Sequence, residues 1–304
     1  FVQDALAVSL QLKGISQMSK TVLNPLSQVR NFLSNTFVVG ANGLLGRNMG
    51  IFESGQVLLA NAIDSPEQFR LLKAMQDEGA IGQNIQLSEV KNLLKEQTKS
   101  GVSAMLNTGG KLLRKTPVAG TTVNFMEKTY QLGDDYWKVV GALGEKARYG
   151  AALRKAGLDI ENVNPAVQDA LVNAKIAKRK TSIAGTDFGD MLAVDVVKQT
   201  MPVYSMVPEV IKSLRRIPVM GNFMAFPAEI IRTSGNIVNR SVREMGFKAT
   251  DELVAAMGEE QAKAFARQIR GIGAERLTGY ISMATVAPGA MRNAAHDVLG
   301  ITEA

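Results

Sequence analysis

The chain of 304 residues contains no cysteine and only one histidine, His296. The absence of cysteine excludes disulfides, thiolate nucleophiles and cysteine-ligated metals. A Ser-His pair or a histidine metal site would have to use His296, which we interpret as an incidental surface or helix-end residue. Aromatic residues make up only 6% of the chain, and this scarcity disfavours recognition of single strands by base stacking.

The recognisable motifs of common enzymes are also missing from the sequence. There is no P-loop, zinc-protease helix, calcium loop or Gly-x-Ser-x-Gly elbow. The acidic pairs Asp134-Asp135 and Glu259-Glu260 are adjacent, so on a helix the two members of each pair point to different faces and do not form a two-carboxylate site. We expect both pairs to serve solvation of the surface or the electrostatics of a helix end. We therefore predict that this segment is not an enzyme and needs no cofactor or metal, although flanking sequence could carry an enzyme.

What the chain has in excess is positive charge combined with apolar residues. Its net charge is +7 with a pI near 9.5, and 46% of its residues are hydrophobic, including 14 methionines. Such a balance predicts attraction to nucleic acid or anionic lipid without sequence recognition. The chain begins at Phe1 without a basic leader and apolar core, so we expect no intact signal peptide and an excerpt or processed product.

Apolar residues recur at helical spacing along most of the chain, and polar caps or prolines mark the helix starts. We predict an all-α fold, an elongated multi-helix assembly with Gly/Pro-interrupted helices and no substantial sheet. Gly133, Gly141 and Gly144 should allow bends or close packing in a long helix. Helices are predicted over residues 2–19, 25–39, 66–79, 122–155 and 186–200, and from residues 88, 165, 251 and 259. The predicted regions are an N-terminal helical region (1–108), a basic Gly/Pro connector (109–121) and a C-terminal helical region (122–304).

The glycines at 40, 43 and 46 allow a competing interpretation. Gly40, Gly43 and Gly46 follow the mainly apolar run Thr36-Phe37-Val38-Val39. The run and the glycines together resemble the first strand and the glycine turn of a short-chain dehydrogenase. None of the five tyrosines has the Lys four residues later that this family requires. A helix that begins at Pro25 and ends through these glycines is the favoured alternative.

Two basic clusters are the candidate contacts to phosphate or anionic lipid. The second cluster precedes an uncharged stretch at 217–228, which is too short to span a bilayer as a helix. A solvated helix end is the competing interpretation of the first cluster. The clusters consist of Lys175, Lys178, Arg179 and Lys180, and of Lys212, Arg215 and Arg216.

Two stretches carry a family resemblance. Residues 20–35 (KTVLNPLSQVRNFLSN) and 216–236 (RIPVMGNFMAFPAEIIRTSGN) resemble internal virion or DNA-ejection proteins of tailed bacteriophages and related large multidomain phage polypeptides. The resemblance implies a structural protein of the virion core that helps to package the genome and deliver it into the host. Some such proteins carry peptidoglycan-cleaving or polymerase domains, and this segment shows neither.

The resemblance also implies partners and a location. The expected partners are other copies of the chain, the portal or other internal virion proteins, the DNA backbone, and the host membrane during ejection. The expected location is the virion interior, then the host cell envelope. Two alternatives stay open: a divergent dehydrogenase-like nucleotide-binding enzyme using the three glycines, and a basic all-α nucleic-acid-binding module without a virion role.

Overall fold

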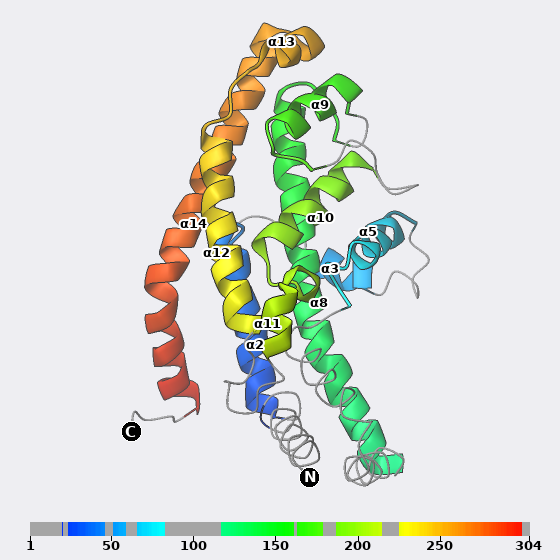
Figure 1. The fold of residues 1–304 in the computed structure, drawn as a ribbon, viewed down its shortest axis with the longest axis vertical. Helices are drawn as coiled ribbons and strands as arrows, with labels where there is room; N and C mark the ends of the chain where they lie inside the picture. The colour runs from blue at the N-terminus through cyan, green and yellow to red at the C-terminus, as the bar shows by residue number, and fades with distance from the viewer. Residues whose placement is uncertain are drawn as a thin grey trace. The chain divides into compact units, whose positions relative to one another are not determined.

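The fold is all-α, as the sequence predicts. The computed structural model describes residue 20 and residues 24–45, 51–58, 66–82, 117–160, 163–178, 187–214 and 225–299. Of these residues 80% are helical, and none of them lies in a strand (Figure 1). The predicted helices at 2–19 and from 88 lie outside the described residues.

The helices follow one another with short connections in several places. Their bounds, in chain order, are α2 (Pro25–Ala41), α3 (Ile51–Leu58), α5 (Pro66–Asp77), α8 (Pro117–Lys155), α9 (Pro165–Asn173), α10 (Phe188–Thr200), the 3-10 turn η1 (Tyr204–Met206), α11 (Glu209–Leu214), α12 (Ala225–Met245), α13 (Asp251–Met257) and α14 (Glu259–Leu299).

The helix starts have the local chemistry that the sequence predicts. Asn164 Oδ1 accepts a 2.9 Å hydrogen bond from the Ala166 amide, and Pro165 occupies the first position of α9. Asp187 caps α10 in the same way, and Thr250 caps α13. The predicted starts at residues 25, 66, 165, 251 and 259 are therefore confirmed.

Glycines inside α8 and α14 allow close packing and do not end these helices. A Cβ on Gly141 would lie 2.8 Å from the sulfur of Met201, and one on Gly144 would lie 3.1 Å from Leu44. α8 begins at Pro117, so residues 117–121 of the predicted connector are helical, whereas 109–116 lie outside the described residues. The predicted region boundaries remain predictions.

The described residues fall into two compact units, and the helices α2, α8 and α12 each contribute residues to both. One unit contains the described residues before 35, those from 79 to 136 and those from 202 to 232. In it, the rings of Phe32 and Tyr136 stack with centroids 6.2 Å apart. Asp135 accepts a 3.1 Å hydrogen bond from the Gly82 amide. Asp134 and Asp135 are 6% and 8% exposed, so the prediction that this pair lies at the surface is wrong.

The other unit contains residues 35–78, 137–201 and the described residues from 233 onward. Its apolar core lies between the C-terminal half of α8, α9, α10, α13 and the first half of α14. Phe247 and Phe265 meet edge to face there, with centroids 5.8 Å apart. α14 runs beside the part of α12 after residue 232 (Figure 1), and their backbones approach closely at Gly273, where a Cβ would lie 2.7 Å from Ser241 O.

Candidate functional site

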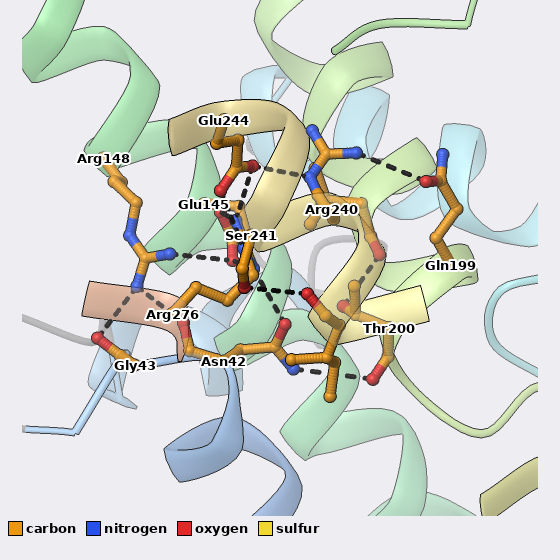
Figure 2. A network of polar contacts seen from close by, with 12 residues as sticks. Asn42, Gly43, Glu145, Arg148, Gln199, Thr200, Arg240, Ser241, Glu244 and Arg276 are labelled. Carbon is orange, nitrogen blue, oxygen red and sulfur yellow. Dashed lines mark hydrogen bonds and ion pairs between the residues drawn. The ribbon is translucent and has the colours of Figure 1, made fainter. Parts of the chain in front are cut away.

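A network of charged side chains is buried inside this second unit, where four helices meet. α8 supplies Glu145, Arg148 and Tyr149; α12 supplies Arg240 and Glu244; α14 supplies Arg276; and the turn after α2 supplies Asn42. Figure 2 shows the groups other than Tyr149 converging on one another. Each of the seven side chains is at most 3% exposed. Such complete burial is rare for charged residues, and five of the seven are charged.

Arg276 is the centre of the network. Its guanidinium holds Glu145 through Nη1 and Nη2 at 2.7 and 3.0 Å, and Glu244 through Nε and Nη2 at 3.1 and 3.2 Å (Figure 2). Nη1 also donates to Asn42 Oδ1 at 2.8 Å. The five N–H donors of an arginine therefore have five acceptors. No donor of Arg276 is left for a ligand.

Arg240 and Tyr149 complete the surroundings of Glu244. Arg240 Nε donates to Glu244 at 2.8 Å, and its Nη2 donates to the Tyr149 hydroxyl at 2.9 Å and to the Ile176 carbonyl at 2.8 Å. The Tyr149 hydroxyl donates to Glu244 at 2.5 Å. Nη1 of Arg240 reaches Gln199 at the end of α10 at 3.4 Å (Figure 2). This arm connects α8, α10, α12 and the chain after α9.

Arg148 binds the end of α2. Its Nη2 donates to the carbonyls of Asn42 and Gly43 at 2.9 and 2.8 Å, and its Nη1 lies 3.5 Å from Glu145. The C-terminus of a helix carries about half a negative charge on its free carbonyls. The three arginines and two glutamates leave one surplus positive charge, and Arg148 places it against these carbonyls.

The surroundings keep both carboxylates charged. Burial alone raises the pKa of Glu145, but Arg148 and Arg276 outweigh burial and hold its pKa at about 2. Burial likewise raises the pKa of Glu244, and Arg276 and Arg240 more than offset it, so this pKa also lies below its usual range. Burial raises the pKa of Tyr149, so this side chain stays a neutral donor.

The chemistry of this arrangement is structural. Removing a charge from water costs several kcal/mol, which is recovered only where geometry and hydrogen bonding are nearly complete. Arg276 satisfies that condition. A general acid or base needs a pKa near the working pH and access to a substrate, and Glu145, with its pKa at about 2 and 1% exposure, has neither.

A smaller acidic cluster lies at the start of α10 in the same unit. Lys146 Nζ lies 3.2 Å from Asp187 and 2.9 Å from Asp190, and Asp187 also caps the helix through the Asp190 amide. Burial, with the neighbouring Asp187 charge, raises the pKa of Asp190 to about 6, against the lowering effect of Lys146. Asp190 therefore titrates about one pH unit below neutral.

The structure describes only part of the predicted phosphate or lipid contacts. Lys175 and Lys178 are exposed, as such contacts require. α9 ends at Asn173, and Lys175 follows it in a left-handed conformation with φ of 58°. Arg179, Lys180, Arg215 and Arg216 lie outside the described residues, as does the side chain of Lys212.

The dehydrogenase-like interpretation of the glycines is wrong for the described residues. The expected first strand, residues 36–39, belongs to α2. Gly40 lies inside that helix, and a Cβ there would lie 2.9 Å from the sulfur of Met283. Gly43 has φ of 70° in the turn after the helix, where a Cβ would lie 2.5 Å from the Glu275 carbonyl oxygen. These two glycines allow α14 to pack against the end of α2, and Gly46 is not among the described residues.

Sequence reasoning missed the buried network. Its only local signals are the pairs Glu145–Arg148 and Arg240–Glu244, at helical spacings of three and four residues. Such pairs are common on exposed helix faces, so spacing alone does not indicate burial. The long-range partner, Arg276, lies 131 residues from Glu145 in the chain.

Searches for metal sites, membrane spans and relatives gave no match. Within the described ranges, no group of three or more His, Asp or Glu side chains is placed to hold a metal ion. No helix in the described part of the chain combines the length and apolarity needed to cross a bilayer. Comparison with protein families, curated protein sequences and solved structures found nothing similar to the chain.

Proposed function

We propose that the chain is a structural protein of a tailed-phage virion interior, or a segment of one, that helps to package the genome and deliver it into the host. The resemblance of residues 20–35 and 216–236 to internal virion and DNA-ejection proteins suggests this role. The observation that carries the structural part is the saturated network around Arg276, which fastens four helices together and offers no donor of that arginine to a substrate.

Exposed apolar side chains support self-association as part of the proposal. Ile231, Val210 and Val286 are 75%, 71% and 61% exposed, and Val242 is 56% exposed. Contact with further protein surface would remove these side chains from water, at about 25 cal/mol per Å² of apolar area buried. We propose other copies of the chain, the portal or other internal virion proteins as the partners, and the host envelope as the location after ejection.

The basic clusters would act in delivery. In this proposal Lys175 and Lys178 contact DNA phosphates or anionic lipid heads, together with Arg179, Lys180, Lys212, Arg215 and Arg216. Such contacts are electrostatic and independent of sequence, so salt should weaken them strongly. They would suit a protein that travels with a genome of any sequence.

The test combines the location of the chain with its assembly. Mass spectrometry of purified virions, and of infected-cell envelopes, should detect peptides of the chain in both. Electron microscopy of the purified chain, with its mass measured in the same buffer, should show a discrete ring or tube of helical subunits. Absence from virions would overturn the proposal. A stable monomer that binds DNA in a salt-dependent manner would favour the stand-alone nucleic-acid-binding module.

A further inference from the structure

A basic pocket lies away from the buried network, where the loop after α12 meets the first turns of α14. Its volume is about 310 Å³. Four cationic side chains and two alanines line it: Lys248, Ala249, Lys263, Ala266, Arg267 and Arg270. All four cationic residues are exposed, so solvent and ligands can reach them.

The cations are arranged in a row. Lys263, Arg267 and Arg270 are spaced by four and three residues on α14, so they share one face of the helix. At 1.5 Å per residue the row is about 10.5 Å long, so it can face more than one phosphate of a nucleic-acid backbone. Lys248 adds a fourth charge from the loop.

The loop that carries Lys248 is held against α14. Phe247 is 4% exposed and packs edge to face on Phe265 of α14, and Arg270 Nη1 donates to the Phe247 carbonyl at 3.3 Å. Lys248 therefore stands beside the row before any ligand binds. Preorganisation of this kind lowers the entropy that binding costs.

Most of the positive charge in the pocket is not neutralised by acidic side chains of the described residues. Lys263 pairs with Glu259 at 2.5 Å, and the two side chains are 55% and 64% exposed, so solvent screens this pair. Lys248 and Arg267 have no ion-pair partner among the residues that the structure describes. The acidic residues at the starts of α13 and α14 do not belong to the lining.

The lining decides between classes of polyanion. It contains no aromatic side chain on which a base could stack, and this disfavours single strands. Its apolar part is alanine, and none of the large exposed apolar side chains belongs to it, although an interfacial membrane site needs such groups beside its cations. A lining with several cations and no stacking or large apolar group fits the densely charged phosphate backbone of a duplex.

We propose that this pocket binds the phosphate backbone of double-stranded DNA without reading its sequence. The inference deepens the proposed function, on which it rests for the partner, the packaged genome. It assigns DNA contact to four residues outside the two basic clusters, on a surface that the second unit forms by itself. Arg267 and Lys248 would each neutralise one phosphate, with Lys263 and Arg270 beside them.

The test is fluorescence anisotropy of a labelled 20-base-pair duplex with the purified full chain, between 50 and 300 mM salt. The variant Lys248→Gln/Arg267→Gln removes two phosphate contacts and should lower the slope of log affinity against log salt by about 1.8. If the two proteins bind equally at 1 M salt, the variant then binds about 60-fold more weakly than the wild type at 0.1 M salt. The control Lys73→Gln/Arg154→Gln removes the same charge from exposed sites of the same unit and should retain more than half of the wild-type affinity.

Several outcomes would overturn the inference. They are a wild-type chain that does not bind the duplex at 50 mM salt, a Lys248/Arg267 variant no weaker than its control, and binding to vesicles of phosphatidylglycerol that exceeds binding to DNA and needs the same two residues. A chain found in virions that fails these tests would leave the proposed function standing. A chain that passes them and is absent from virions would retain the DNA site and lose the virion role.

Discussion

Replacing Arg276 by methionine tests whether the buried network holds the second unit together. The change removes a guanidinium with 0% exposure and keeps an unbranched side chain in place of the aliphatic stem. Among the described residues, Glu145 then keeps an ion pair with Arg148 alone, at 3.5 Å, whereas Glu244 retains Arg240 and Tyr149. Removing one partner of a buried ion pair typically costs about 3–5 kcal/mol, because it leaves a charge without compensation.

The loss should depend on pH, and the sign follows from Glu145. Its pKa of about 2 in the folded chain lies below the ordinary value of 4.5, so its charged form is favoured by folding. The stabilisation, about 3 kcal/mol at about 1.4 kcal/mol per pKa unit, is present above pH 4.5 and is lost as pH falls toward 2. Arg148 and Arg276 both lower this pKa, and without Arg276 its share of the stabilisation disappears. Arg276→Met should therefore destabilise the chain most at pH 7 and less at pH 3.5.

The assay is urea unfolding followed by circular dichroism at 222 nm, at pH 7 and at pH 3.5. The matched control is Arg267→Met on the same helix, where the side chain is exposed, and the change should alter the free energy of unfolding by at most about 0.5 kcal/mol. A loss below about 1 kcal/mol for Arg276→Met at pH 7 would refute the reasoning. So would a loss that is equal at the two pH values.

Three further changes probe other parts of the structure. The pKa of Asp190, raised from 3.8 to about 6, makes the native chain lose stability as pH rises from 3.8 toward 6, with no further loss above it. Between pH 4.5 and 7 this loss is about 2 kcal/mol, at about 1.4 kcal/mol per pKa unit. Asp190→Asn should abolish it, and Tm measured from pH 4.5 to 7 checks this. Gly43→Ala should lower the free energy of unfolding in urea by at least about 2 kcal/mol, because φ of Gly43 is positive and the new Cβ meets the Glu275 carbonyl. The control Gly157→Ala, also with positive φ but with open space around it, should lower it by about 1 kcal/mol. Asn164→Ala removes the cap of α9 and should lower the free energy of unfolding by about 1 kcal/mol; an unchanged Tm would contradict the capping role.

The fold class and most helix starts could be predicted because they depend on local chemistry. Asn164 and Thr250 stand directly before helices that they cap through their own side chains. A cap acts within three residues, so the sequence contains the whole interaction. The packing partner of Gly141 in α8 could not be read in this way, because it is Met201, 60 residues away in the chain.

The buried network could not be predicted because its residues are ordinary until the helices meet. The pair Arg240–Glu244 has the spacing of a solvated ion pair, and nothing within four residues shows that Arg276 will lie against it. The surface prediction for Asp134 failed for the same reason, since burial is a property of the assembled helices. A charged residue in a helical sequence is usually exposed, but it can be buried where other helices bring it a partner.

Buried ion pairs often stabilise a fold no more than apolar residues of similar volume would, so the network needs a reason other than stability. Apolar side chains tolerate several registers of one helix on another, because hydrophobic contact has little direction. A shift of α14 by one turn, about 5.4 Å, would carry Arg276 beyond hydrogen-bond reach of both Glu145 and Glu244. The backbone contact of Gly279 with Gly40, where a Cβ would lie 2.6 Å from the carbonyl oxygen, fits the same single register. We infer that the network selects this register, which also fixes the row of cations on the first turns of α14.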